Sequence, residues 1–185
     1  MAAAAIIVLI IAGALLGVVT LYNILVRKRQ LANNGWSDID VQLKRRADLI
    51  PQLVNAVKGY AAHERALFEE IAERRAMALA AGDDPAIRAK AEGALSQPLS
   101  RMVALAEAYP DLKANENFLA LQRELAATED KIEMARRFYN GAVRELNTLV
   151  ESVPSNLVAG AFGFSSRAYF EIGDGDRATP RVSHD

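Results

Sequence analysis

Residues 2–26 read AAAAIIVLIIAGALLGVVTLYNILV, and this stretch decides how the chain is organised. It contains no charged side chain and consists almost entirely of Ala, Ile, Val, Leu and Gly. As an α-helix rising about 1.5 Å per residue it would be roughly 37 Å long, enough to cross a hydrocarbon core of about 30 Å with some tilt. We therefore expect an N-terminal transmembrane anchor, with the rest of the chain working beside a bilayer.

A cleaved signal peptide is the main alternative to a retained anchor. Signal peptides have a basic start, a shorter apolar run and a small-residue cleavage site. Residues 1–5 contain no Lys or Arg, and the apolar run is longer than a usual signal. Ala12-Gly13-Ala14 resembles a cleavage site, but apolar sequence continues beyond it. We therefore expect the helix to be retained, and the absence of cysteine excludes a lipid attached to a thiol.

Three basic residues, Arg27, Lys28 and Arg29, follow the apolar run directly. Basic side chains beside a membrane span tend to stay in the cytoplasm. The sequence therefore predicts a single-pass protein with its N-terminus outside and its larger part in the cytoplasm. The charge difference across the span is small, so a large part on the outer side is the alternative.

Gly13 and Gly17 form a small-xxx-small pair within the span. This spacing places both glycines on one helix face, where two membrane helices can approach closely. The alternative is that Gly and Ala are simply frequent in membrane helices. We therefore treat Gly13 and Gly17 as candidates for membrane-helix packing.

The composition limits the function classes. The chain has 22 basic and 23 acidic side chains, so it lacks the basic field that non-specific nucleic-acid binding requires. It has no cysteine, which excludes disulfides, thiol catalysis and thiolate metal sites. Ala, Leu, Glu, Arg and Lys dominate beyond the span, and this composition favours long helices over strands.

The pattern beyond the span predicts three long helices. Residues 30–81 carry an apolar helical stripe, which we expect to be kinked or divided at Pro51, with a new helix starting near Asp48. Gly82-Asp83-Asp84-Pro85 predicts a turn between helices, and residues 85–108 predict a second helix with a kink or break at Pro98. Residues 109–113 predict a loop.

The third helix is expected from about Asn115 to Val153, where apolar residues alternate in steps of three and four. A sustained period of 3.5 residues is typical of helical bundles and coiled coils. Thr128 is the one polar residue in this seam, and we expect it to hydrogen-bond to its own helix. The seam comprises Phe118, Leu121, Leu125, Thr128, Ile132, Ala135, Tyr139, Ala142, Leu146, Leu149 and Val153.

These elements predict an all-α protein, with a transmembrane helix followed by an antiparallel up-and-down bundle of three to four long helices. We expect an anchor with its basic flank at residues 1–29, a helical bundle at 30–171 and a disordered tail at 172–185. Residues 156–164 and Tyr169-Phe170 are too apolar for a free tail. We expect them to form an ordered flap over one end of the bundle.

No complete catalytic or metal-binding set is found. His63-Glu64 begins like a zinc-protease helix, but Leu67 replaces the second histidine that such a site requires. The glutamates at 69, 70 and 73 lack the Glu-x-x-His pairs of di-iron bundles, and the segment 174–176 lacks most ligands of a calcium loop. We therefore expect no enzyme activity, no cofactor and no bound metal.

A cluster of basic residues in the first helical stripe has a structural and a functional interpretation. Lys44-Arg45-Arg46 lies close in sequence to Asp38, Asp40 and Asp48, which favours ion pairs on the helix surface over contact with lipid headgroups.

Asp40 and Glu64 fall on or beside the apolar stripe of the first helix. Arg136 or Arg137 is the candidate partner of either one. We expect such a polar pair near the bundle core to fix helix register more than stability.

Several strings together resemble the bacterial LemA family, and their order and spacing cover nearly the whole chain from the anchor to Phe170. Two positions depart from the family pattern, since Gly35 and Ala47 are smaller than expected and would loosen local packing. The matching strings are Tyr22-Asn23, NGWSDIDVQLKRR at 34–46, DLIPQLV at 48–54, KGY at 58–60, His63-Glu64, LKANENF at 112–118, TEDKI at 128–132, ARRFYN at 135–140 and FGF at 162–164.

The resemblance implies a protein of the bacterial inner membrane, with a single N-terminal membrane helix and a helical bundle that faces the cytoplasm. It implies no established catalytic activity. Magnetosome proteins of the same broader family are a more distant resemblance. Family members are often associated with membrane metalloproteases or membrane stress, which implies scaffold or adaptor work. We expect the chain to bind the lipid bilayer and another membrane protein, a membrane metalloprotease among the candidates, or a copy of itself. A lipid-binding or membrane-shaping protein is the alternative, and a metal-binding enzyme is a remote one.

Overall fold

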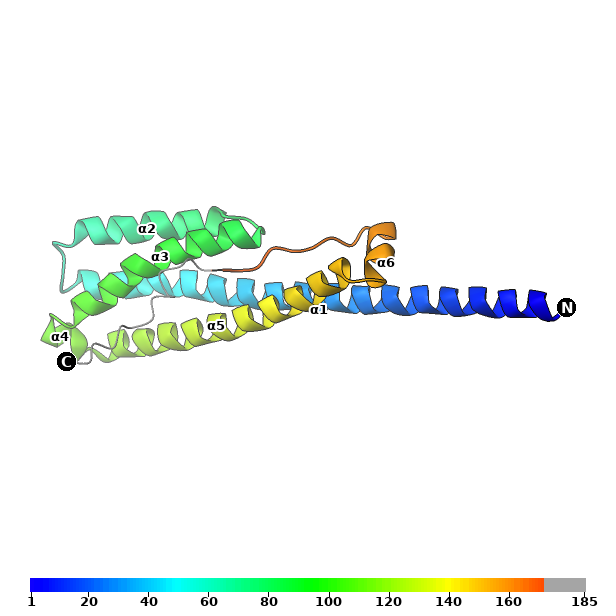
Figure 1. Cartoon of the computed structure of the whole chain (residues 1–185). Coiled ribbons are helices and arrows are strands. Elements are labelled where there is room, and N and C mark those ends of the chain that lie inside the picture. The colour runs from blue at the N-terminus through cyan, green and yellow to red at the C-terminus, as the bar shows by residue number, and fades with distance from the viewer. Residues whose placement is uncertain (172–185) are drawn as a thin grey trace, which may run out of the picture. The chain divides into compact units, whose positions relative to one another are not determined.

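The computed structural model describes residues 1–171 and contains six helices and no strand within that range (Figure 1). This confirms the all-α prediction. The tail predicted at 172–185, with its acidic segment at 174–176, lies outside the described residues. The helices are α1 (Ala2–Lys58), α2 (Arg65–Ala80), α3 (Pro85–Ala106), α4 (Pro110–Lys113), α5 (Glu116–Glu151) and α6 (Ser155–Ala161).

Helix α1 continues through Pro51 without a break, so the expected division there is wrong. Proline has no N–H, and it therefore leaves the carbonyl four residues earlier without its helical donor. That carbonyl belongs to Ala47, and the side chain of Arg75 in α2 donates a hydrogen bond to it (Nε to O, 2.6 Å). A side chain from a second helix thus replaces the missing donor. The chain instead leaves the helix after Lys58, at Gly59.

The turn between α2 and α3 forms at the residues predicted for it. Gly82 has a φ of 68°, in the left-handed region that glycine adopts without steric cost. The Asp84 side chain then caps α3 by accepting hydrogen bonds from the backbone N–H groups of Ala86 and Ile87, both at 2.9 Å. Pro85 occupies the first turn of α3, where a missing N–H has no consequence.

Two details of the later helices differ from the prediction. Helix α3 runs through Pro98 without a break, and the segment expected as a loop contains the short helix α4, which begins at Pro110. The long third helix is confirmed as α5, but Val153, expected as the last residue of its seam, lies beyond the helix and is exposed. Its start is capped by Asn115, whose side-chain oxygen accepts a hydrogen bond from the N–H of Phe118 at 3.1 Å.

The described chain divides into two compact units, and each takes part of α1 and part of α5. We call Met1–Asp40 with Glu133–Tyr169 the anchor unit. We call Val41–Ile132, with the described residues from Phe170 onwards, the bundle unit.

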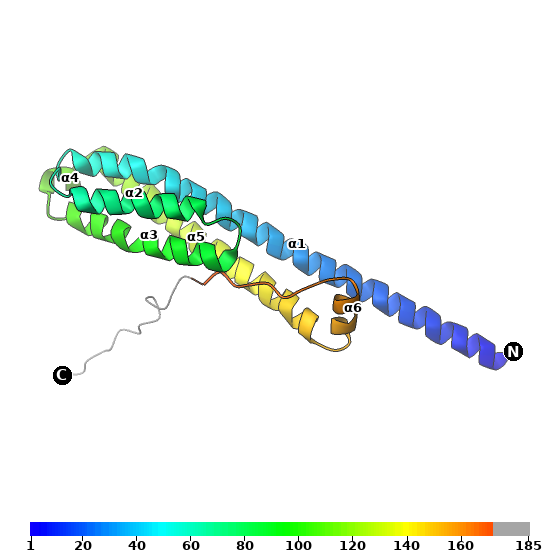
Figure 2. The same ribbon diagram turned by 90° about the horizontal axis from the view of Figure 1, so that it is seen from above.

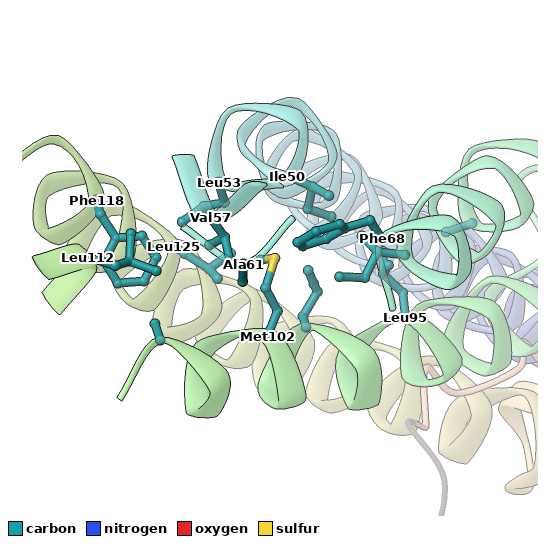
Figure 3. Packing of buried hydrophobic residues seen from close by; sticks show 14 residues of the cluster. Ile50, Leu53, Val57, Ala61, Phe68, Leu95, Met102, Leu112, Phe118 and Leu125 are labelled. Carbon is teal, nitrogen blue, oxygen red and sulfur yellow. The ribbon is translucent and has the colours of Figure 1, made fainter. Parts of the chain in front are cut away.

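The bundle unit has a continuous aliphatic core. In this unit α2 and α3 lie side by side along the end of α1, as Figures 1 and 2 both show. Figure 3 shows the side chains of the core directed toward one another from all the helices of the unit. The core comprises Ile50, Leu53, Val57, Ala61, Phe68, Ile71, Ala78, Leu95, Leu99, Met102, Ala106, Leu112, Phe118 and Leu125.

The anchor unit has an apolar core of its own and a close crossing of two helices. Leu25 of α1 and Leu146 of α5 pack against Val158, Ala159 and Phe164 from α6 and the segment after it.

Gly35 lies where α1 meets α5. A Cβ at this position would be 3.0 Å from both Cδ1 of Phe138 and Cα of Tyr139. The expectation that Gly35 loosens the packing is therefore wrong, because its missing side chain is what allows the two helices to approach.

Candidate membrane-anchoring site

The apolar part of α1 is bare, which means that no other part of the described chain covers it. Every residue from Ala2 to Thr20 is exposed, and Leu25 is the first buried residue of the chain. By length and composition, α1 is the one helix among the described residues that could cross a membrane, and none of its apolar window is buried. A soluble protein does not leave so long an apolar helix exposed to water. This N-terminal helix therefore suggests a membrane anchor.

Aromatic side chains gather where the bare part of α1 ends. The ring of Tyr22 meets Phe162 and Phe164 edge-on, with centroids 4.9 Å and 5.7 Å apart. The guanidinium of Arg29 lies over the other end of this group, 4.8 Å from the centre of the Phe164 ring. Tyrosine, with an apolar ring and a polar hydroxyl, favours the level where hydrocarbon gives way to headgroups. The arrangement places a ring cluster at the end of the apolar segment.

The basic flank is partly engaged within the anchor unit. Arg27 is exposed, whereas Lys28 pairs with Glu145 of α5 and Arg29 contacts the Phe164 ring. The hydrogen bond and the positive charge of Lys28 lower the pKa of Glu145 below its ordinary value. Glu145 therefore offsets one of the three charges on which the predicted orientation depends, and the orientation stays a prediction.

The two glycines of the span face open space. A Cβ at Gly13 or at Gly17 would have no neighbour within 4 Å among the described residues. The described chain therefore leaves this small-residue face uncovered, as a helix–helix packing role would require.

Polar contacts hold the segment after α6 against α5. Asn147 makes two hydrogen bonds with the backbone of Arg167. The Nδ2 of Asn147 donates to the Arg167 carbonyl at 2.9 Å, and the Arg167 N–H donates to the Oδ1 of Asn147 at 2.8 Å. The hydroxyl of Tyr139 donates to the carbonyl of Ala168 at 2.9 Å. Asn147 was not predicted as a structural residue, although it lies next to the apolar seam residue Leu146.

The bundle unit contains a buried ion-pair network that sequence analysis missed. Arg46 is only 1% exposed and pairs with Glu92 of α3 and with Glu129 of α5, the latter at 3.0 Å. Glu92 also accepts a hydrogen bond from Arg88, Nε to Oε1, at 3.0 Å. Burial opposes the positive charge of Arg46, but the carboxylates of Glu129 and Glu92 outweigh burial and raise its pKa.

This network corrects the expectation for Lys44-Arg45-Arg46. Arg45 pairs with Glu124 of α5 rather than with a carboxylate of its own helix, and Arg46 is buried rather than on the surface. The signal was present in the sequence, since Arg46 follows Leu43 by three residues and precedes Ile50 by four. That spacing places Arg46 on the apolar face of α1.

The polar residues expected to pair near the core lie in different units. Asp40 is exposed in the anchor unit, and Arg137 pairs with Glu133 one turn away on α5. Glu64 belongs to the bundle unit, where it lies beside His63. The two arginines, Arg136 and Arg137, belong to the anchor unit. Thr128, by contrast, is buried and donates to the carbonyl of Glu124 at 2.8 Å, which confirms its predicted local hydrogen bond.

His63 lies in a hydrogen-bonded contact and not in a metal cluster. Its Nε2 is 2.9 Å from the hydroxyl of Tyr109, and the side chain is exposed. Within residues 1–171, no three His, Asp or Glu side chains gather to hold an ion.

Comparison with known proteins gives one family and several distant relatives. The model of the LemA family matches residues 35–184. A magnetosome protein MamQ of Paramagnetospirillum magneticum is 24% identical, over 87% of this chain and 70% of the relative. The MamQ of Magnetospirillum gryphiswaldense is 23% identical over the same shares. Protein LemA of Metamycoplasma hominis is 24% identical, over 84% of this chain and 71% of the relative.

Proposed function

Because this chain belongs to the LemA family, we propose that it is a non-enzymatic interaction or scaffold module at the bacterial cytoplasmic membrane. A retained N-terminal helix anchors it, with the N-terminus outside and the helical part in the cytoplasm. Its partner is another membrane protein or a second copy of the chain.

The continuity of α1 carries this proposal. The helix is bare through Thr20 and then supplies buried residues to both units, Leu25 to the anchor unit and Leu53 to the bundle unit. A single helix is thus both the candidate anchor and part of each core. This construction suits a protein that holds a helical surface beside a membrane.

The open face of Gly13 and Gly17 is the feature most suited to a partner within the bilayer. In hydrocarbon, close packing of backbones replaces the hydrophobic effect as the force between helices. The bundle unit also has exposed apolar side chains, such as Val41 on α1 and Ile87 on α3, and single exposed residues of this kind need no partner.

Crosslinking of the full chain in intact bacterial membranes tests the interaction. We expect a reproducible dimer or a reproducible crosslink to another membrane protein, which the double substitution Gly13→Leu, Gly17→Leu weakens. The matched control is Ala14→Leu with Val18→Leu, on a neighbouring face of the same helix. Only monomers with no reproducible partner would contradict the proposal.

The orientation has its own test, which the absence of cysteine makes clean. A membrane-impermeant maleimide should leave an Ala120→Cys variant unlabelled in intact cells and label it once the cells are opened, because Ala120 is exposed on α5. Labelling of this variant in intact cells would place the helical part outside. Intact mass measured on the membrane-extracted protein shows whether the anchor is retained.

The metal-enzyme alternative is tested by metal analysis, with a variant of His63, which is the only histidine in the described range. Metal analysis of the purified full chain is expected to show no stoichiometric metal. A stoichiometric ion that is lost in the His63→Ala variant would favour the metal-enzyme alternative.

A further inference from the structure

The segment between α5 and the last described residues has an apolar outer face. We call residues 153–164, which include α6, the C-terminal flap. Its inner side chains Val158 and Phe164 are buried in the core of the anchor unit. Its outer side chains are not: Val153 is 78% exposed, Leu157 70% and Phe162 54%. A helical segment that is apolar on both faces is unfavourable in water, because one face remains unburied.

The flap also lacks charge over an unusual length. Between Glu151 and Arg167 the chain has fifteen residues, 152–166, and none of them is charged. The next longest uncharged run after the basic flank has nine residues, 49–57. The uncharged run includes the exposed positions, where a soluble protein normally places its charged residues.

The position of the flap along α1 indicates which medium contacts its outer face. Figures 1 and 2 show α6 beside α1 within the anchor unit, and Phe162 contacts Tyr22 there. The bare segment Ala2–Thr20 has nineteen residues, about 28 Å of helix, which is close to the thickness of a hydrocarbon core. The flap therefore contacts α1 at the level where a helix that begins at Ala2 would leave the hydrocarbon core. Arg27, Lys28 and Arg29 follow on the side away from the span.

We propose that the C-terminal flap is a second membrane-contacting element, whose outer side chains Val153, Leu157 and Phe162 enter the bilayer interface beside the end of the span. The inference rests on the anchoring part of the proposed function. An interfacial segment of this kind buries its apolar face at the boundary of headgroups and acyl chains. Tyr22 and Phe162 then lie in the aromatic belt, and the basic flank lies among the headgroups.

A bilayer fits this surface better than a protein partner does. The exposed Phe162 of the flap contacts Tyr22, and Val18 and Val19, about one turn earlier on α1, are also exposed. Whatever surrounds that helix therefore also reaches the flap, and for a membrane span the surrounding medium is lipid.

Three single-cysteine variants of the full chain test the proposal: Leu157→Cys in the flap, Leu9→Cys in the span and Met134→Cys on α5. Met134 is an exposed apolar residue of the anchor unit and serves as the matched control. Each protein is placed in vesicles of phosphatidylethanolamine and phosphatidylglycerol and labelled with the same environment-sensitive fluorophore. Quenching is measured with nitroxide lipids of known depth and with an aqueous cobalt salt.

We expect lipid nitroxides near the headgroups to quench the Leu157 label and the aqueous quencher to have lost access to it. The Met134 label should respond to cobalt alone, and the Leu9 label to deep nitroxides alone. A Leu157 label that behaves like the Met134 label overturns the inference and leaves the anchor intact. A Leu157 label shielded from both quenchers also overturns it, because protein then covers the flap. A Leu9 label in water refutes the anchor itself.

The label is itself apolar, so a second measurement uses a charged reagent. In native membranes, a sulfonate thiosulfonate should modify Met134→Cys readily, whereas the flap variant Leu157→Cys should have lost this reactivity. Equal reaction rates at the two positions would overturn the proposal.

Discussion

The two units of the described chain differ in how they bury apolar surface. The bundle unit encloses fourteen buried apolar residues in one core and adds the buried Arg46 with its carboxylates. In the anchor unit, one cluster of five buried apolar residues includes Leu25, and ring contacts surround Tyr22. The apolar face of the flap is exposed there, together with the bare segment Ala2–Thr20.

This difference teaches where each unit obtains its stability. A unit that buries its own apolar residues gains the hydrophobic free energy from its own packing. A unit that exposes them gains it only when another apolar medium covers them. Substitutions in the bundle unit should therefore act mainly through internal packing and charge, and those in the anchor unit through helix approach and the membrane interface.

The largest expected effect distinguishes Arg46 from its neighbour Arg45 in the bundle unit. Arg46→Ala leaves the buried Glu92 with Arg88 as its remaining cation, and breaking a buried pair costs about 3 kcal/mol or more. We expect the free energy of unfolding of the bundle unit to fall by about that amount, measured by hydrogen exchange of α3 amides in lipid nanodiscs.

Arg45→Ala is the matched control, since its pair with Glu124 is exposed and such pairs contribute about 1 kcal/mol or less. Equal losses for the two variants would mean that burial does not distinguish Arg46, and the contrast drawn between the units would weaken.

The next effect concerns the helix crossing in the anchor unit. Gly35→Val places new carbon atoms against the backbone of Tyr139, and overpacking of this kind costs about 1–3 kcal/mol. Gly141→Val is the control in the same unit, because no atom outside its own stretch of helix lies within 4 Å of its Cβ position. We expect the first variant to lose hydrogen-exchange protection in the anchor unit and the second to retain it. Similar protection in both would contradict the close approach.

A smaller effect is expected at the cap of α3. Asp84→Ala removes the acceptor for two backbone N–H groups, and loss of such a cap costs about 1 kcal/mol. Asp83→Ala, one residue earlier and exposed, should change stability by less than about 0.5 kcal/mol. The comparison uses the thermal midpoint of the bundle unit, and a larger shift for Asp83→Ala would refute the assignment.

The smallest effect is electrostatic and lies in the anchor unit. Lys28 lowers the pKa of Glu145, so the contribution of this pair is present above the ordinary glutamate pKa and is lost as the pH falls through the lowered value. In the Lys28→Gln variant, the pKa of Glu145 should rise toward its ordinary value. Carbon-13 NMR titration of the carboxyl group checks this. An unchanged pKa would mean that the pair does not persist in solution.

The helices were predictable because their signals are local. The helix over the uncharged residues 2–26, the Gly82–Pro85 turn and the seam of α5 as far as Leu149 depend only on neighbouring residues, and each appears in the structure. What failed depended on residues far away in sequence. Pro51 stays within a helix because of Arg75, and that donor cannot be read from the residues around the proline.

The candidate site was predictable in outline. The anchor and its basic flank follow from composition, but the flap's contact with Tyr22 joins residues 140 positions apart along the chain. Arg46 was assigned to the surface because charged residues usually lie there. Its position three residues after Leu43 indicated burial, but the partner Glu92 is identified only when α3 is placed against α1.

The bond between Arg75 and the Ala47 carbonyl has a mechanical consequence. While α2 is docked, the Ala47 carbonyl keeps a hydrogen-bond donor although Pro51 supplies none. If α2 detached, we expect α1 to bend more easily at this turn, because proline favours a kink. The longest helix among the described residues thus depends on a shorter one for a complete set of hydrogen bonds at its proline.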